Sequence, residues 1–268
     1  MTAPYPDEAT LAAAGLRLEL AGAVVTVTLA RPEQRNAQTP ATWRALAGIG
    51  DAIGDDVRVV VLRGEGEPFS SGLDRALFAP NGLAGEQSLA ELGALDDDEL
   101  DETIAAFQQG FSWWRRPELV SVAAVQGAAV GAGFQLALAC DLRVVADDAR
   151  FAMRETSLGL VPDLGGTKPL VDAVGYARAL EICATGRWVE AGEARELGLA
   201  TIVVPRQRLA DSVADLVAAL TEPLHGAVAG LKQLLVGAAD RAYDEQLLAE
   251  RVVQAARLRD LALAMRGA

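Results

Sequence analysis

Apolar and polar positions alternate most regularly near the start of the chain. Residues 16–20 and 24–29 alternate on either side of a short Ala-Gly turn, which predicts two strands joined as a β-hairpin. Thr39 followed by Pro40 is typical of a helix start, because a threonine side chain caps free N–H groups and proline fits the first helical position. The apolar spacing that follows predicts a helix that continues to residue 53.

Two later runs are continuously apolar, and each is followed by a turn of small residues. Residues 57–62 precede PFSSGLD at residues 68–74, and residues 119–125 precede GAG at residues 131–133. A continuous apolar run predicts a buried strand, and the small residues after it predict a turn into a helix. The first turn of a helix leaves backbone N–H groups without intrahelical partners. Two such turns brought together would aim two N–H donors at one point, as in an oxyanion hole.

The regular pattern divides the chain into two regions. Strand-like and helix-like runs alternate through residues 200–204, and Ala/Leu-rich helical patterns dominate from Leu209 onward. We therefore expect an α/β fold with a ββα core over residues 1–205, which holds the site, and a helical region over residues 206–268.

Composition and charge narrow the class of protein. The chain has 268 residues, of which 51% are hydrophobic, enough for a sizeable core. The formal net charge of −13 argues against nucleic acid as a partner, because phosphate neutralisation needs clustered Lys and Arg. The first residues lack a basic stretch followed by an apolar run, and no apolar run reaches the ~18 residues of a membrane span. We expect a soluble, cytoplasmic protein.

Cysteine and histidine are too few for several kinds of site. Cys140 and Cys183 are the only cysteines and lie in no paired motif, so the sequence predicts no disulfide framework, zinc site or redox pair. His225 is the only histidine and has no nucleophile motif near it, which argues against Ser-His-Asp and Cys-His catalysis. Acid–base chemistry is therefore expected from carboxylates, without a metal.

Several motifs follow one another in an order that resembles the enoyl-CoA hydratase/isomerase family, the crotonase superfamily. Besides the two glycine turns, they occupy residues 31–37, 140–146, 151–166 and 191–205. The resemblance implies a crotonase-like spiral of ββα turns whose C-terminal helices support a homotrimer or a hexamer. It also implies an acyl-CoA thioester as substrate, with coenzyme A as part of that substrate and no separate cofactor.

The resemblance implies an oxyanion hole that holds the thioester oxygen. Its donors would be the backbone N–H groups of Leu73 and Ala132, and Ala132 stands where family members usually have glycine. Donors fixed before the reaction stabilise an enolate without reorganising. Motif matching also implies contacts to coenzyme A from five residues, several through backbone atoms: Arg35, Asn36, Ala37, Ser71 and Asp74.

Hydratases of this family use two glutamates, and this chain matches only the second. Glu155 is that match and is expected to be the main acid/base, whereas Gln135 stands at the first position. An amide can position a water molecule but cannot take a proton at ordinary pH. Adding water across a double bond needs both a base and an acid, whereas one base can move a proton from one carbon to another.

Asp163 offers a second carboxylate after Glu155. Its place resembles the dienoyl-CoA isomerase branch, in which two carboxylates pass protons between distant carbons of a conjugated acyl chain. The other interpretation of Asp163 is a cap at the start of the next helix. We prefer double-bond isomerisation, and two alternatives stay open: hydration by Glu155 with Gln135 holding the water, and a non-catalytic acyl-CoA-binding protein.

Residues 75–110 break the regular pattern. They contain an Asn-Gly pair and the acidic run DDDE at residues 96–99, with a helix expected to start near Asp98. One interpretation is a solvated, mobile segment, and the other is a lid over the acyl pocket. We favour the lid, because in the family that the chain resembles this region lines the acyl site.

Overall fold

Nine strands form two sheets in the computed structural model, which describes residues 3–80 and 82–267. The strands are β1 (Leu16–Ala21), β2 (Val24–Leu29), β3 (Val59–Gly64), β4 (Val120–Val125), β5 (Ala128–Val130), β6 (Leu142–Ala146), β7 (Arg150–Ala152), β8 (Val189–Glu190) and β9 (Ile202–Val204). The larger sheet has the order β1-β2-β3-β4-β6-β9 and is parallel except for the β1–β2 hairpin, while β5, β7 and β8 form the smaller sheet. The expected α/β fold and the hairpin are confirmed.

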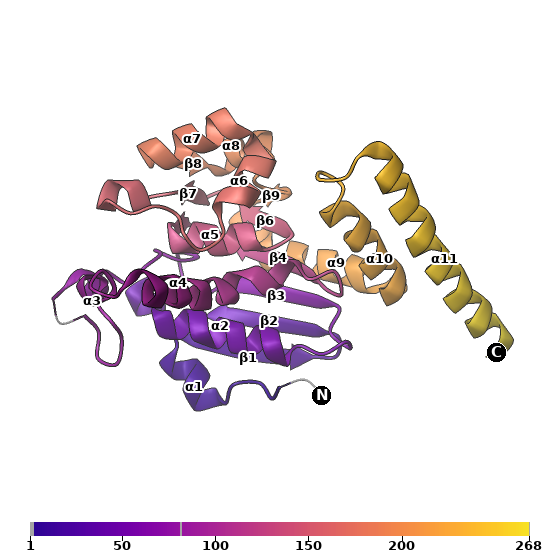
Figure 1. Ribbon diagram of the computed structural model, residues 1–268, viewed down its shortest axis with the longest axis horizontal. Helices are drawn as coiled ribbons and strands as arrows, with labels where there is room; N and C mark the ends of the chain where they lie inside the picture. The colour runs from indigo at the N-terminus through magenta and orange to yellow at the C-terminus, as the bar shows by residue number, and fades with distance from the viewer. Residues whose placement is uncertain (1–2, 81, 268) are drawn as a thin grey trace.

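Helices cover both faces of the larger sheet, with α2 and α4 side by side on one face and α9 on the other (Figure 1). The α-helices are α1 (Glu8–Ala13), α2 (Pro40–Ala52), α3 (Leu89–Leu92), α4 (Asp97–Ser112), α5 (Ala132–Ala139), α6 (Thr167–Val174), α7 (Tyr176–Thr185), α8 (Ala191–Glu196), α9 (Leu209–Thr221), α10 (His225–Val236) and α11 (Tyr243–Gly267). The 3-10 helices are η1 (Pro32–Gln34), η2 (Arg75–Phe78), η3 (Trp113–Arg115), η4 (Glu155–Leu158) and η5 (Arg206–Arg208).

The central strands are buried on both faces because alternate side chains enter two separate cores. On β3, Val60 and Leu62 belong to the core beneath α2 and α4, whereas Val59 and Val61 belong to the smaller core beneath α9. Burying a Val or Leu side chain contributes roughly 1.5–3 kcal/mol. Both faces of β3 therefore need apolar residues, which explains why its sequence is continuously apolar rather than alternating.

The start of helix α2 was predicted correctly from the sequence, whereas strand β3 starts two residues later than predicted. Thr39 caps α2 through its side chain, and Pro40 is the first helical residue, as predicted. The strand expected from residue 57 begins later, at Val59, because Val57 N–H donates to Gly54 O in a turn. Gly54 and the two aspartates after it are typical turn residues, but Val57 is apolar like the strand, so the apolar pattern alone places the start too early.

The C-terminal helices are attached to the sheet in different ways. The helix α9 packs on the larger sheet, whereas α10 and α11 project to one side of it (Figure 1). The helix α10 is tied to the sheet by Lys232, whose Nζ donates to Leu119 O and to Asp141 Oδ2, both at 2.6 Å. The helical character of residues 206–267 is thus as expected, while the division of the chain at residue 205 stays a prediction.

Several side chains singled out in the sequence have ordinary structural surroundings. Both cysteines are free, and burial raises the pKa of the Cys140 thiol, which keeps it protonated. His225 is the first residue of α10, and its Nε2 lies 2.6 Å from Glu118 O. Across residues 3–80 and 82–267, no helix is long and apolar enough to cross a membrane. The same part of the chain holds no group of three or more His, Cys, Asp and Glu side chains able to bind a metal ion.

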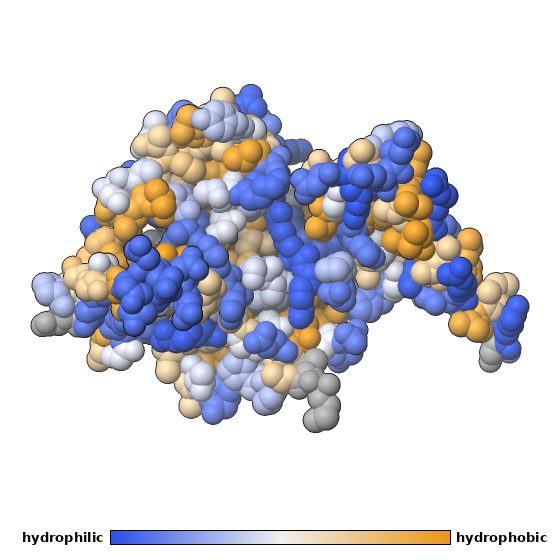
Figure 2. Space-filling view, viewed as in Figure 1, coloured by the Kyte–Doolittle hydropathy of each residue, from blue (hydrophilic) through white to orange (hydrophobic). Residues whose placement is uncertain are grey.

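Exposed apolar side chains on α10 and α11 lead to a prediction about assembly. Leu235, Leu248 and Val252 are 63%, 55% and 62% exposed, and Figure 2 shows hydrophobic residues along both helices. Packing this face against other copies of the chain would remove it from water, which supports the trimer or hexamer that the family resemblance implies. Light scattering at micromolar concentration should return three or six times the protomer mass of 28.0 kDa.

A monomer mass in that measurement would contradict the expectation. Leu248→Asp and Val252→Asp place a charge on the apolar face and should lower the measured mass. Leu20→Asp is the matched control, because Leu20 is 58% exposed on β1, away from α10 and α11, and its substitution should leave the mass unchanged.

Candidate active site

The two glycine turns predicted from the sequence lie side by side. Ser70, in the first turn, exchanges backbone hydrogen bonds of 3.0 Å with β5, so this turn extends the smaller sheet. Gly72 has a φ of 84°, and a Cβ on it would collide with the Val130 carbonyl and lie 3.4 Å from Ala132 N. Glycine is therefore needed for this approach, which brings Leu73 close to the start of α5.

Neither of the two predicted oxyanion donors, the N–H groups of Leu73 and Ala132, donates a hydrogen bond within a sheet or helix. Gln38 N–H donates to Gly72 O and Asp74 N–H donates to Gln38 O, both at 2.8 Å, which leaves the Leu73 N–H between them outside the ladder. Ala132 is the first residue of α5, so its N–H has no intrahelical partner and adds the positive end of the helix dipole. Every residue of α5 is buried, and the low dielectric constant around it strengthens the electrostatic effect of the helix dipole. The geometry suits an oxyanion hole, and that role of Leu73 and Ala132 stays a prediction.

Glu155 lies against the same turn. It begins η4 and is 9% exposed, and a Cβ on Gly131 would lie 3.3 Å from its Oε1 and 3.6 Å from its Oε2. Its Oε1 accepts a hydrogen bond from Gln135 Nε2 at 2.7 Å. Its Oε2 is buried and has no hydrogen-bond partner among the residues that the structure describes. One carboxylate oxygen is thus held in place, and the other has no hydrogen bond within the described residues.

The surroundings of Glu155 change its acidity. Burial raises the pKa of Glu155 above the ordinary glutamate value, because the charged form loses its hydration. The nearby backbone N–H of Glu155 and the hydrogen bond from Gln135 oppose this rise in pKa, and the charge of the neighbouring Asp163 adds to it. Loss of hydration also raises the pKa of the Asp163 carboxyl, because protein atoms surround it, although the residue as a whole is solvent-exposed. Neighbouring carboxylates with raised pKa values are typical of acid–base sites.

Asp163 does not cap a helix, so the capping interpretation is wrong. The helix α6 begins at Thr167, and its N-cap is Gly166, which makes no side-chain cap. The Asp163 carbonyl accepts a hydrogen bond from Gln108 Nε2 of α4 at 2.7 Å. This contact ties the loop of Asp163 to the predicted lid segment.

Gln135 is the buried residue that orients Glu155. It is 1% exposed, and its amide oxygen accepts from Leu164 N–H at 3.0 Å and from Gly166 N–H at 3.3 Å. An amide oxygen accepts two such hydrogen bonds, so the two donors assign the oxygen to their side and the nitrogen to the side of Glu155. Gln135 therefore presents only N–H donors toward Glu155 and any ligand beside it.

The five residues expected to contact coenzyme A lie on two neighbouring segments. Ser71 N–H donates to Arg35 O at 2.9 Å, so residues 35–37 run beside residues 70–74 and close to Leu73. Arg35 is exposed and Ser71 is half-buried, so both are accessible to a ligand. The structure thus brings the five residues together, and their contacts to coenzyme A stay predictions.

Two of these five side chains already hold the turn together. Asn36 is buried, and its amide bonds to backbone atoms of Arg31 and Pro68, both at 3.0 Å. Asp74 pairs with Arg31 Nη2 at 3.1 Å and accepts from Ala76 N–H at 3.0 Å. A contact from Asn36 or Asp74 to coenzyme A would therefore come mainly from backbone atoms, as the motif match allows.

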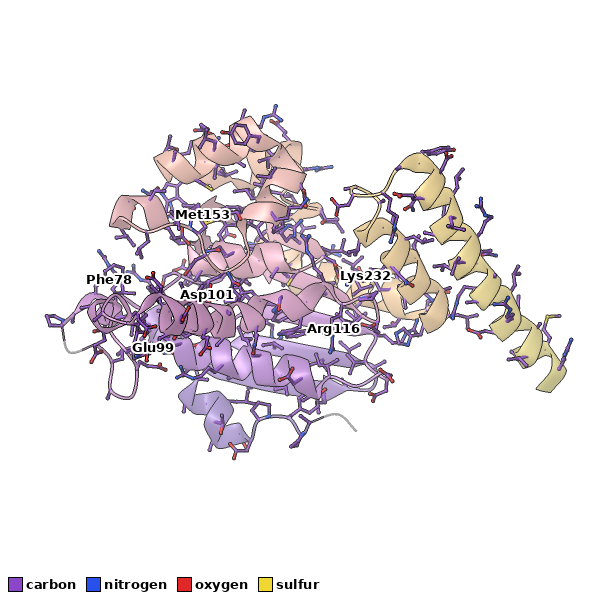
Figure 3. All side chains as sticks on the ribbon, in the orientation of Figure 1. Phe78, Glu99, Asp101, Arg116, Met153 and Lys232 are labelled. Carbon is purple, nitrogen blue, oxygen red and sulfur yellow. The ribbon has the colours of Figure 1, made fainter. Side chains whose placement is uncertain are left out.

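The segment over residues 75–110 is built from η2, α3 and α4, and α4 packs along α2. Glu86 fixes the loop before α3, because its carboxylate accepts from Ala41 N–H at 2.7 Å and pairs with Arg44 at 2.9 Å. Phe78 lies at the outer end of this segment, near α3, and is 41% exposed (Figure 3). The segment is therefore anchored on one side to α2 and on the other to the loop of Asp163, and its role as a lid stays a prediction.

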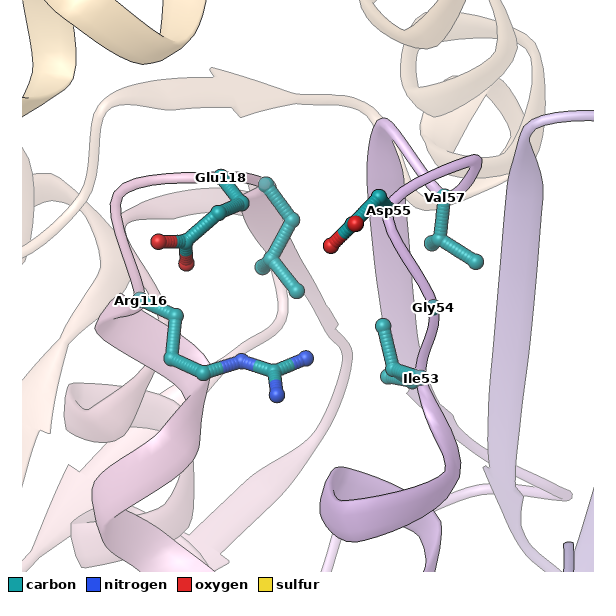
Figure 4. Close-up of a pocket in the computed structure, with 7 residues that line it drawn as sticks. Ile53, Gly54, Asp55, Val57, Arg116 and Glu118 are labelled. Atoms are coloured by element: carbon teal, nitrogen blue, oxygen red, sulfur yellow. The ribbon is translucent and has the colours of Figure 1, made fainter. Parts of the chain in front are cut away.

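A separate cavity of about 260 Å³ lies away from these residues (Figure 4). It is lined by Ile53, Gly54, Asp55, Val57, Arg116, Glu118 and Leu119. These residues precede β3 and β4 and so lie at the amino ends of two parallel strands, whereas the glycine turns follow the carboxyl ends. Ligands of parallel sheets bind beyond the carboxyl ends of the strands. The cavity is not part of the candidate active site.

The sequence matches one protein family over most of its length. The family model named enoyl-CoA hydratase/isomerase matches residues 19–260. A probable enoyl-CoA hydratase from Rhizobium meliloti (strain 1021) is 33% identical over 196 residues, which cover 72% of this chain and 70% of that protein. A mitochondrial Delta(3,5)-Delta(2,4)-dienoyl-CoA isomerase from Dictyostelium discoideum is 30% identical over 184 residues, which cover 68% of this chain and 62% of that protein.

Solved structures agree with this match. The crystal structure of a candidate enoyl-CoA hydratase from Thermobifida fusca YX in complex with CoA has a TM-score of 0.92 and 46% identity, and covers 96% of this chain and 98% of that chain. The same Thermobifida protein in complex with acetoacetyl-CoA also has a TM-score of 0.92. The crotonase-like fold expected from the motifs is confirmed, and the chain belongs to the enoyl-CoA hydratase/isomerase family.

Proposed function

We propose that this protein binds acyl-CoA thioesters and moves a double bond within the acyl group. Support for the ligand comes from the complexes of the Thermobifida relative with CoA and acetoacetyl-CoA, at 46% identity. One observation carries the choice of reaction. Beside Glu155 stands the amide of Gln135, whose oxygen already accepts two hydrogen bonds. A single base next to the proposed oxyanion hole is sufficient to move a proton between two carbons.

The proposed reaction begins at the carbon next to the thioester carbonyl. Glu155 Oε2, which is buried and unpartnered within the described chain, takes a proton from C2 of a 3-enoyl-CoA. The electron pair of the broken C–H bond moves onto the thioester oxygen, where the N–H groups of Leu73 and Ala132 stabilise the enolate. The Glu155 carboxyl then returns the proton to C4, and the double bond moves from C3–C4 to C2–C3.

Asp163 would extend the same chemistry to a longer conjugated acyl group. In a 3,5-dienoyl-CoA, Glu155 would take a proton from C2 and a protonated Asp163 would give its own proton to C6, which lies beyond the reach of one fixed carboxyl. A proton transfer from Glu155 to Asp163 would then restore the starting state. The charge of Asp163 influences the pKa of Glu155, so the two groups share one electrostatic environment. The Dictyostelium relative is named a dienoyl-CoA isomerase, which supports a substrate of this class.

Hydration is the second candidate, because the names of the Rhizobium and Thermobifida relatives refer to hydratases. Water would then lie between Glu155 and Gln135. The amide of Gln135 can donate to that water but cannot remove its proton, so Glu155 would have to act both as base and as acid. A non-catalytic acyl-CoA-binding protein is the remaining alternative, and it differs from both enzymes by having no turnover.

Three substrates separate these functions in one assay of the purified protein. We expect 3-enoyl-CoA or 3,5-dienoyl-CoA to be converted faster than 2-enoyl-CoA is hydrated, as followed by ultraviolet absorbance. Faster hydration than isomerisation would replace the proposed function by the second candidate. Tight binding of all three thioesters without conversion would support the non-catalytic alternative.

Glu155→Gln should lower turnover by ~10²-fold or more, because an amide cannot take the C2 proton. Binding of CoA thioesters should stay close to that of the wild type, since Glu155 is not among the residues expected to contact coenzyme A. Turnover and thioester binding are measured on the same preparations. Glu8→Gln, an exposed substitution on α1, serves as the control for handling. Unchanged turnover in Glu155→Gln would remove Glu155 from the mechanism.

The pH dependence of kcat/KM should report the raised pKa of Glu155. The base must be ionised, so the rate falls as the pH drops through its pKa, and burial places that limb above the ordinary glutamate value of 4.5. Asp163→Asn removes a neighbouring negative charge, which should lower the pKa of Glu155 and move the limb to lower pH. A limb that stays in place would show that the two carboxyls are not coupled, and one that moves to higher pH would contradict the predicted direction.

Gln135→Glu should raise hydration of 2-enoyl-CoA much more than the 3-to-2 double-bond shift. The new carboxylate would keep the donors Leu164 N–H and Gly166 N–H and would give water a base that the amide cannot supply. Its other oxygen would face Glu155 Oε1, so the pKa of one carboxyl of the pair should rise. Both substrates are therefore compared over a pH series. Faster hydration by the wild type, lowered further by the substitution, would make Gln135 a working part of a hydratase.

A further inference from the structure

A chain of buried polar side chains lies directly behind the Leu73 turn. Trp43 Nε1 donates to Gln38 Oε1 at 2.9 Å, and Gln38 Nε2 donates to Ser70 Oγ at 3.1 Å. Gln38 and Ser70 are both 0% exposed. Buried polar groups in native proteins are nearly always hydrogen-bonded, and these bonds fix the Gln38 and Ser70 side chains in place.

Ser70 joins the two turns of the proposed oxyanion hole. Its hydroxyl donates to Asn36 O at 2.7 Å and accepts from Gly72 N–H at 3.2 Å, besides the bond from Gln38. A hydroxyl has one donor and two acceptor sites, so all three are in use. A Cβ on Gly133 would lie 2.8 Å from Ser70 Oγ, so the same hydroxyl packs against the first turn of α5.

Gln38 holds the Leu73 turn from the other side. Its backbone N–H donates to Gly72 O and its carbonyl accepts from Asp74 N–H, both at 2.8 Å. These two bonds fix the residues directly before and after Leu73. The side chain of Gln38 then links this backbone to Ser70 and, through Trp43, to the core beneath α2. The direction of the Leu73 N–H is thus set by groups that do not touch a ligand.

We propose that Gln38 and Ser70 are positioning residues that hold the Leu73 N–H in the geometry needed to stabilise an enolate. This inference rests on the proposed function, because it concerns the charge that develops on the thioester oxygen. A preorganised donor stabilises that charge only while it stays aimed at the oxygen, and a small displacement lowers the rate strongly. Loss of the Ser70 hydroxyl removes the acceptor for Gly72 N–H, one residue before the donor.

Acetoacetyl-CoA provides a direct readout of the oxyanion hole. It ionises to an enolate with a distinct ultraviolet band, so donors that stabilise the enolate lower the pKa of the bound ligand. We expect the wild type to lower this pKa relative to free acetoacetyl-CoA, and Ser70→Ala to bring it back toward the free value. Isomerase turnover in Ser70→Ala should fall by ~10–100-fold with KM changed less than about twofold.

Two further variants separate positioning from a general loss of stability. Gln38→Met keeps the side-chain volume but removes its hydrogen bonds, so it should shift the ligand pKa in the same direction by less. Ser121→Ala is the matched control: Ser121 is also 0% exposed, and its hydroxyl bonds to Trp114 O at 2.7 Å, at the amino end of β4. It should lower thermal stability and leave the ligand pKa unchanged.

The outcomes distinguish this inference from the proposed function. Wild-type ligand pKa and turnover in both Ser70→Ala and Gln38→Met would overturn the positioning role while leaving the oxyanion hole in place. Equal shifts of the ligand pKa in Ser70→Ala and Ser121→Ala would also overturn it. A wild-type protein that binds acetoacetyl-CoA without changing its pKa would overturn the oxyanion hole and the inference with it. If Ser70→Ala does not fold, the comparison of Gln38→Met with Ser121→Ala decides.

Discussion

The close approach of Gly72 to the Val130 carbonyl is the constraint on which the candidate site depends. Any side chain at Gly72 would collide with that carbonyl, and its φ of 84° disfavours other residues as well. Because this contact joins the turn after β3 to the end of β5, it sets the separation of the Leu73 and Ala132 N–H groups. Glu155 then lies against Gly131, so the proposed donors and the proposed base lie around one small turn.

The position of Glu155 lowers the stability of the fold. Burial disfavours its charged form, and Oε2 has no partner in the described part of the chain. A residue that served only the fold would be expected to have both oxygens bonded. The hydrogen bond from Gln135 and the rigid, fully buried helix α5 hold the carboxylate in this unfavourable position. A raised pKa together with a carboxylate oxygen that has no hydrogen bond is typical of an acid–base group in an active site.

The sequence was most informative where glycines and apolar runs carry the geometry. The hairpin, the start of α2 and the two turns with Leu73 and Ala132 follow from local patterns, and the structure brings the two turns together. The sequence shows that residue 135 is an amide rather than a carboxylate, but it does not show how the amide is oriented. That orientation depends on the N–H groups of Leu164 and Gly166, which lie in a loop that comes close to Gln135 only in the folded chain. Asp163 was ambiguous for the same reason, since capping depends on where α6 begins.

The choice between two reactions rests on one atom in a scaffold that accommodates either. The N–H groups of Leu164 and Gly166 that fix the amide oxygen of Gln135 would fix a carboxylate oxygen equally well. The other terminal atom of the residue-135 side chain faces Glu155. If it is nitrogen, as in Gln135, Glu155 meets a hydrogen-bond donor, and if it were a carboxylate oxygen, Glu155 would meet a second base. We therefore expect the reaction of this protein to depend on Gln135 and Glu155.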